Sequence, residues 1–282
     1  MHQTDLNLQH LPNLDVAPKF GLIIIGDEIL SGKRADKHLP KMIELLKARG
    51  LSLAYAEYVG DEPERITAAL QRAFVSGDVV FSTGGIGATP DDHTRQCAAR
   101  ALDVKLELHP QAKVLIEQRM QDVALEQGKT YDPMQADNLH RLNMGVFPQG
   151  SQIIPNPYNK IPGFSCGHVH FVPGFPVMAW PMMAWVLDTH YPVFFAKDAW
   201  LERSVVVFGA MEATLTPLME TIERDFTGIK VFSLPSVDHP EYGRHIELGV
   251  KGAPDAVAPA FAALLDGLAP FRVKFGPELV RS

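Results

Sequence analysis

Short apolar runs alternate with amphipathic segments from Phe20 onward. The run FGLIII (20–25) predicts a buried strand, whereas HLPKMIELLKARG (38–50) carries apolar residues at helical spacing and ends in glycine, which stops helices. The same order continues with predicted strands at 52–59 and 78–83 and predicted helices at 63–74 and 90–102. Because such repeated units form a parallel sheet with helices on both faces, the sequence predicts a three-layer α/β/α domain.

The segment that follows is less regular. Residues 110–144 have helical spacing with interruptions, IIPNPYNKIPGF (153–164) is rich in loop residues, and HVHFVPG (168–174) predicts a short strand entering a turn. FPVMAWPMMAWVLDTHY (175–191) predicts an apolar helix that Pro181 can kink. Its methionines and tryptophans exceed what one helix face requires, so we expect either core packing or a homo-oligomer interface.

A different order of elements begins after about Ala196. Predicted strands cover 201–209, 229–237, 243–252 and 270–276, with predicted helices at 211–226 and 254–268. This is the β-α-β-β-α-β order of a ferredoxin-like unit. The sequence therefore predicts a flexible amino-terminal tail (1–18), a three-layer α/β domain (19–196) and a small α+β subdomain (197–282).

Composition limits the kinds of partner that the chain is expected to bind and the cellular compartment in which it is expected to occur. The chain has 282 residues, 46% of them hydrophobic and 21% charged, with a net charge of −7 that offers no positive field for nucleic acid or anionic lipid. Cys97 and Cys166 are too few for a disulfide framework. No apolar run reaches membrane-spanning length, and the first residues lack the features of a secretory signal. We expect a cytoplasmic protein without nucleic-acid or membrane partners.

Glycines and acidic residues follow the predicted strands of the first domain. The strands are followed in turn by GDE (26–28), GDE (60–62) and TGGIG (83–87). In open parallel sheets, ligands bind beyond the carboxyl ends of the strands. The sequence therefore predicts a ligand edge lined by glycine backbone and carboxylates.

The stretch FSTGGIGATPDDHT (81–94) places glycines directly before two aspartates. Gly84, Gly85 and Gly87 allow a tight turn that presents N–H groups, and the helix start adds partial positive charge, which suits a phosphate. No lysine follows as in a Walker loop, and the dinucleotide pattern G-x-G-x-x-G is absent.

Asp91 and Asp92 allow two interpretations. In the first they cap the helix, with Thr89 as the N-cap, Pro90 at the first helical position and Asp92 at the third. In the second they hold a divalent cation between themselves and a phosphate, as Mg²⁺ is commonly held. The ligands for that ion come from Asp92, Asp91, Asp27, Glu28 and Asp61. The residues alone leave both interpretations open.

Two further groups of residues have a structural and a functional interpretation. Cys166, His168 and His170 alternate on one face of a predicted strand but lack a remote fourth metal ligand, which favours a structural role. His93 suits either proton transfer or a solvent-facing helix position. No G-x-S-x-G nucleophile elbow occurs.

Five motifs in order along residues 20–190 carry a family resemblance. GDEILSG (26–32), VGDEPERI (59–66), TGGIGATPDDHT (83–94), NKIPGF (159–164) and VPGFPVM (172–178) resemble the CinA amino-terminal family, within the MoaB/Mog/gephyrin-type molybdopterin-binding superfamily. The tail at 201–276 is similar to the small subdomain of CinA-like proteins. We expect a stand-alone form without the nicotinamide-nucleotide amidase domain of full-length CinA.

The resemblance implies an oligomeric α/β domain whose ligand edge binds molybdopterin or a nucleotide diphosphate. CinA-type domains are associated with metal-dependent ADP-ribose pyrophosphatase activity, and MoaB/Mog-type relatives bind or adenylylate molybdopterin. The motifs assign substrate or phosphate binding to Thr83, Gly84, Gly85, Gly87, Thr89, Thr94, Asn159, Lys160, Gly163, Pro173 and Gly174. Asp27 stands where many members carry threonine, and Ala88 and Ile161 also depart from the usual forms.

These observations support three hypotheses. The leading one is metal-dependent hydrolysis of a nucleoside diphosphate such as ADP-ribose, in which the amides of 84–87 and Lys160 bind phosphate oxygens. In it, Asp92, Asp61 and Asp27 hold Mg²⁺ or a similar ion, with Asp92, Asp91 and Glu28 as catalytic groups. The second is a molybdopterin-binding protein of cofactor biosynthesis without turnover. The third, RNA binding by the second unit, is disfavoured because its strands lack paired aromatic and basic residues.

Overall fold

The computed structural model describes residues 18–195 and 201–281. The chain divides into two units, Met1–Phe195 and Ala196–Ser282. Except for its last residue, the expected tail at 1–18 lies outside the described residues. Within the described ranges, no helix combines the length and the apolar character needed to span a membrane.

A six-stranded sheet forms the centre of the first unit, in the order β2-β1-β3-β8-β7-β6. The first four strands of this order are mutually parallel, whereas β7 and β6 run antiparallel to their neighbours. The predicted, mainly parallel α/β fold is confirmed. The strands are β1 (Phe20–Ile25), β2 (Leu53–Val59), β3 (Val79–Thr83), β6 (Gln152–Ile154), β7 (Gly163–Cys166) and β8 (Val169–Val172).

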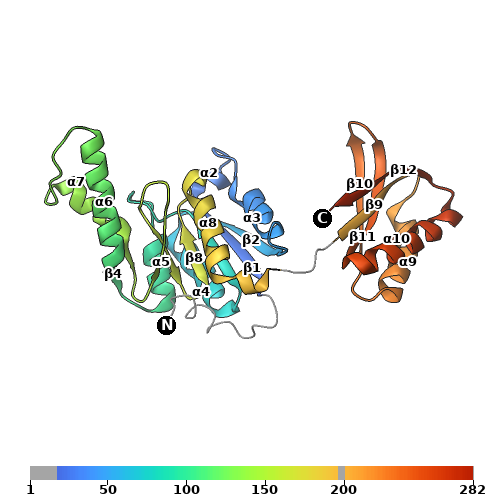
Figure 1. Ribbon diagram of the computed structural model, residues 1–282, viewed down its shortest axis with the longest axis horizontal. Coiled ribbons are helices and arrows are strands. Elements are labelled where there is room, and N and C mark those ends of the chain that lie inside the picture. Colours follow the sequence, from blue (N-terminus) through green and yellow to red (C-terminus); the bar gives the residue numbers. More distant parts are fainter. Residues whose placement is uncertain (1–17, 196–200, 282) are drawn as a thin grey trace. The chain divides into compact units, whose positions relative to one another are not determined.

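Helices cover both faces of this sheet (Figure 1). On one face, α3 (His38–Lys47) and α8 (Pro176–His190) bury Met42, Leu46 and Met182 against β1 and β3. On the other, α4 (Pro63–Ser76) and α5 (Thr94–Leu102) bury Leu70 and Ala98 against the same strands. The central strands are apolar on both sides for this reason, which is why FGLIII is a continuous buried run.

A separate group of elements extends from one side of the first unit (Figure 1). It contains β4 (Leu106–Leu108) paired antiparallel with β5 (Val146–Pro148), and the helices α6 (Pro110–Glu126), α7 (Ala136–Arg141) and η1 (Leu142–Gly145). The sequence predicted interrupted helix here but not the two short strands. A further short helix, α2 (Asp27–Leu30), follows β1 directly, and η2 (Pro192–Phe194) follows α8.

Three predictions about local structure in the first unit are wrong. Helix α5 begins at Thr94 rather than at 90, because Pro90 and Asp91 lie in a turn and the next two residues are not helical. Two strands, β6 and β7, occupy the ends of a segment predicted as loop. Cys166 and His170 do not share one strand, because Gly167 and His168 form the turn between β7 and β8.

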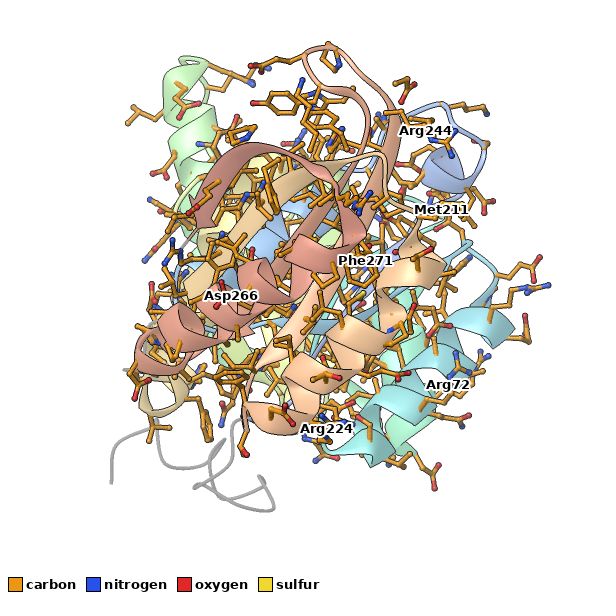
Figure 2. All side chains as sticks on the ribbon, turned by 90° about the vertical axis from the view of Figure 1, so that its right-hand side faces the viewer. Arg72, Met211, Arg224, Arg244, Asp266 and Phe271 are labelled. Atoms are coloured by element: carbon orange, nitrogen blue, oxygen red, sulfur yellow. The ribbon has the colours of Figure 1, made fainter. Side chains whose placement is uncertain are left out.

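The second unit has the predicted β-α-β-β-α-β order. Its strands are antiparallel in the order β10-β11-β9-β12. Both helices lie on one face of the sheet (Figure 2), where Leu215, Ile222 and Phe261 pack against Val205 and Leu248. The last strand begins at Lys274 rather than at 270, because a 3-10 turn intervenes. The elements are β9 (Leu201–Phe208), α9 (Glu212–Asp225), β10 (Lys230–His239), β11 (Gly243–Gly252), α10 (Pro254–Leu268), η3 (Ala269–Phe271) and β12 (Lys274–Arg281).

Candidate functional site

A cavity of about 690 Å³ lies at the carboxyl ends of the parallel strands. It is lined by the residues that follow β1, β2, β3 and β8, as expected for an open parallel sheet. Among the predicted site residues, those at the lining are Glu28, Asp61, Thr83, Gly84, Gly85, Gly87, Thr89, Asp91, Asp92, Asn159, Pro173 and Gly174. The fold therefore brings most of the motifs to one place.

The loop after β3 needs glycine at two positions. Gly84 has φ +95° and Gly85 has φ +67°, in the region that side chains disfavour. A Cβ atom on Gly84 would lie 2.3 Å from the Ile25 carbonyl oxygen, and one on Gly85 would lie 2.1 Å from Thr94 Oγ1. Only glycine allows the backbone to pass this close to β1 and α5.

The first two residues of α5 donate three hydrogen bonds to carbonyl oxygens of this loop. Thr94 Oγ1 donates to Gly84 O (3.0 Å), and Thr94 N–H donates to Gly85 O (3.0 Å). Arg95 Nη2 donates to Gly87 O (2.6 Å). Thr94 is buried and does not line the cavity, so its contact is with the loop rather than with a ligand.

These three bonds also orient the N–H groups of the loop. In a trans peptide the C=O and N–H groups point to opposite sides, so the N–H groups of Gly85, Ile86 and Ala88 point away from α5. Within the described residues, none of the three makes a hydrogen bond. All three residues line the cavity. Three backbone donors are thus held ready for an acceptor.

Thr89 and Asp92 close a turn in front of the helix. Asp92 Oδ2 accepts from Thr89 N–H (2.8 Å) and Thr89 Oγ1 (2.5 Å), while Asp92 N–H donates to Thr89 O (3.0 Å). The predicted pairing therefore exists, but it does not cap α5, which begins two residues later. Asp91 is exposed, and hydrogen bonding to Thr89, with a smaller contribution from His93, lowers the pKa of its carboxyl.

The loops after β1 and β2 are joined by two hydrogen bonds, each from a backbone N–H group to a carboxylate. Asp61 Oδ2 accepts from Asp27 N–H (2.9 Å), and Asp27 Oδ1 accepts from Asp61 N–H (3.2 Å). Burial raises the pKa of Asp61, as do the charges of Asp27, Glu28 and Asp91, against a lowering by the Asp27 N–H bond. Asp27 itself is exposed and does not line the cavity.

The carboxylates do not form a ready metal site. Over residues 18–195 and 201–281, no group of three or more His, Cys, Asp or Glu side chains is arranged to hold a metal ion. Asp27, Asp61 and Asp92 each accept hydrogen bonds from neighbouring backbone instead. Within the described residues, these carboxylates are therefore engaged with backbone donors and are not grouped around a common point.

Two residues of the NKIPGF motif lie away from the cavity. Lys160, with φ +64°, directs its ammonium group to Asp122 of α6, and the two charged groups are 2.5 Å apart. Gly163 is part of β7, where a Cβ atom would lie 2.3 Å from Phe171 O. Asn159 does line the cavity, with Oδ1 accepting from Asn156 and from the Ile161 N–H.

The cavity lining also contains residues that the sequence analysis did not select. Arg34 and Lys37 come from the segment between α2 and α3, His38 is the first residue of α3, and Arg34 lies 3.6 Å from Glu28. His38 is buried, and its Nε2 lies 2.9 Å from the Gly174 carbonyl oxygen. A carbonyl only accepts, so Nε2 carries the proton, and in the neutral ring Nδ1 is left as an acceptor. Nδ1 has no partner in the described part of the chain. The run SGKRADKH (31–38) was the sequence feature from which these residues could have been selected.

The other candidate cluster is a buried polar network. His170 contacts Ser165 Oγ through Nδ1 (2.8 Å) and Tyr191 Oη through Nε2 (2.6 Å). Burial lowers the pKa of His170 well below its usual range and raises the pKa of Cys166 to about 11. Because both ring nitrogens of His170 are engaged and the Cys166 thiol stays protonated, this cluster stabilises the core and does not bind a metal.

Known proteins share this architecture. A protein of Caldivirga maquilingensis is 29% identical over 213 residues, covering 74% of this chain and 77% of the relative. A CinA-like protein of Gloeobacter violaceus is 29% identical over 261 residues; the match covers 88% of this chain but only 58% of that protein's length. A crystal structure of CinA from Thermoplasma acidophilum superposes with a TM-score of 0.51 at 25% identity, covering 61% of this chain and 99% of that one.

The family model described as "Probable molybdopterin binding domain" matches residues 21–194. This range begins at the second residue of β1, extends beyond α8 and contains every residue that lines the cavity. The chain therefore belongs to the probable molybdopterin binding domain family, with CinA-like proteins among its relatives.

Proposed function

We propose that the cavity binds molybdopterin or a closely similar pterin phosphate without turning it over. The observation that carries this proposal is a set of three N–H groups, of Gly85, Ile86 and Ala88, that point away from α5, lack hydrogen-bond partners within the described residues and belong to residues lining the cavity. Clustered backbone donors at a helix start are a recurrent phosphate site. The phosphate of the ligand belongs at this loop.

The rest of the cavity suits a planar heterocycle. Its apolar walls can contact the ring faces, and they comprise Ile29, Met144, Phe175 and Met178. A pterin ring edge carries both N–H donors and acceptor atoms. His38 Nδ1, Asn159 and the carboxylate of Asp61 supply complementary groups at the lining. A mostly apolar cavity with a few polar groups is the usual form of a small-molecule site.

Diphosphate hydrolysis has less support from the site. A carboxylate-rich edge beside a phosphate loop motivated that expectation, but hydrolysis of this class requires a bound cation to neutralise charge and activate water. The carboxylates are hydrogen-bonded to backbone, and within the described ranges no three of them are grouped for a metal. Hydrolysis is therefore an outcome for the experiment to exclude.

The test is an equilibrium titration of the purified protein with molybdopterin, followed by pterin fluorescence under anaerobic conditions. In parallel, ADP-ribose is incubated with the protein and Mg²⁺, Mn²⁺ or Co²⁺, and AMP release is measured with and without chelator. We expect saturable pterin binding and no chelator-sensitive AMP release. Metal-dependent cleavage of ADP-ribose without pterin affinity would overturn the proposal in favour of the hydrolase.

A further inference from the structure

Arg95 is a buried cation directly behind the phosphate loop. Its exposed fraction is 5%, and within residues 18–195 and 201–281 its guanidinium donates only to two neutral acceptors, Gly87 O and Asn143 O. Its Nε has no partner, and it forms no ion pair, among the described residues. An arginine side chain remains protonated in proteins, so a full positive charge lies beneath the loop.

Burying such a charge without a counter-ion costs free energy. Burial lowers the pKa of Arg95, and the charge of Asp92 opposes that effect. The Asp92 carboxylate is itself bonded to Thr89 N–H and Oγ1 and makes no ion pair with Arg95. Within the described residues, the Arg95 guanidinium thus has a carboxylate nearby but no direct ion pair.

The peptide between Gly87 and Ala88 connects this charge to the cavity. The guanidinium donates to the carbonyl side of that peptide, and the N–H of Ala88 points to the other side. A donor bound to the carbonyl oxygen polarises the peptide and strengthens its N–H as a donor. An anion bound to the Ala88 N–H therefore accepts a hydrogen bond from a polarised donor. The buried guanidinium of Arg95 lies on the other side of the same peptide.

We propose that Arg95 is the positioning residue and buried counter-charge that makes this loop select a phosphate dianion over uncharged ligands. The inference rests on the proposed function, because it assigns the phosphate of the pterin ligand to the loop. It goes beyond that function by naming the residue that sets the charge preference without touching the ligand.

The experiment compares Arg95→Gln and Arg95→Lys with the unaltered protein by calorimetric titration. The probes are molybdopterin, 6-hydroxymethylpterin, which lacks the phosphate, and inorganic pyrophosphate. We expect Arg95→Gln to lower affinity for molybdopterin and pyrophosphate by about 10-fold or more, the effect of one partly buried unit charge. Affinity for 6-hydroxymethylpterin should not change, and Arg95→Lys should retain most of the anion affinity.

Arg72→Gln is the matched control. Arg72 lies on α4 of the same unit (Figure 2), is 62% exposed and pairs with Glu57 on the surface. Its loss removes the same net charge without altering the loop, so we expect unchanged binding. As a second measurement, ³¹P resonances of bound molybdopterin should show a lower phosphate pKa in the unaltered protein than in Arg95→Gln, because a nearby cation favours the dianion.

The outcomes separate the two proposals. A folded Arg95→Gln protein that binds molybdopterin and pyrophosphate normally would overturn the Arg95 inference and leave pterin binding intact. Equal losses for the charged and uncharged pterins in both variants would also overturn it, because Arg95 would then only shape the loop. Arg95-dependent pyrophosphate binding without affinity for either pterin would instead reject the proposed function and retain the inference.

Discussion

Three loops at the same sheet edge combine glycine with aspartate, and the loops after β1 and β2 use their backbone N–H groups in the opposite way to the loop after β3. After β1 and β2, the N–H groups of Asp27 and Asp61 are bonded to each other's carboxylates. After β3, the N–H groups of Gly85, Ile86 and Ala88 are left without partners in the described chain, and α5 holds the carbonyl groups. Similar composition thus gives closed loops after β1 and β2 and an open loop after β3, and of the three it is the open loop that leaves several backbone donors for an anion.

The largest expected effect comes from closing the open loop with Gly85→Ala. The added Cβ atom would lie 2.1 Å from Thr94 Oγ1 at a backbone φ of +67°, so the loop or α5 must move. We expect a stability loss of about 1–3 kcal/mol. Molybdopterin affinity should fall about 100-fold, equivalent to about 2.7 kcal/mol. Urea denaturation and fluorescence titration measure the two effects.

Gly150→Ala is the control for that substitution. Gly150 has φ +84°, but an added methyl group would meet no atom within 4 Å beyond its own chain neighbours, and the residue does not line the cavity. The substitution should cost about 1 kcal/mol of stability through backbone strain alone and leave binding intact. If Gly85→Ala bound molybdopterin as well as this control does, the open loop would not be the phosphate site.

An intermediate effect is expected from removing charge in the closed loop after β2 with Asp61→Asn. The raised pKa of Asp61 means that the folded protein holds this proton more tightly than the unfolded chain does. Stability from this group is therefore present below the unfolded value of 3.8 and is lost as pH rises through the raised folded value. Relative to the unaltered protein, Asp61→Asn should gain stability across that window and then level off.

Urea denaturation at a series of pH values from about 3 to 7 measures this difference, and pyrophosphate titration near neutral pH measures its effect on the site. Losing one nearby carboxylate should raise pyrophosphate affinity by roughly 2- to 5-fold. A decrease in affinity, with stability unchanged, would mean that Asp61 assists anion binding, as a metal-holding carboxylate would.

The smallest effect is expected from Lys160→Ala. The ammonium group pairs with Asp122 on the surface, where such pairs contribute about 0–1 kcal/mol. Lys160 does not line the cavity, so molybdopterin affinity should not change. A large loss of affinity in the same titration would instead support the direct contact between Lys160 and a phosphate that the motif suggested.

The sequence predicted the long elements well because their patterns are decided locally. FGLIII has the pattern of a buried strand and forms one, with bounds of Phe20–Ile25. Strands β6 and β7 were not predicted, because three or four residues beside proline and asparagine give too short a pattern. The start of α5 was misplaced because Thr89 and Asp92 carry a helix-cap pattern but use it to close a turn.

The site was only partly predictable for a related reason. Glycines and aspartates in a motif indicate which loop is a candidate for ligand binding, and most of them do line the cavity. Arg95 was missed because a charged residue in a helix usually faces solvent; its burial depends on Asn143, which lies far along the chain in η1. The ammonium group of Lys160 pairs with Asp122 away from the cavity lining, because proximity within a motif does not determine where a long side chain points.

The side chains that hold the loop after β3 are different from the groups that this loop presents to a ligand. The donors offered to a phosphate are backbone groups, and the side chains that aim them, Thr94 and Arg95, do not line the cavity. Phe175 and Met178 line the same cavity but belong to the start of α8 and the residue before it, not to this loop. Under the proposed function, substitutions at such lining positions change which ligand is bound, while the backbone contacts to its phosphate stay the same.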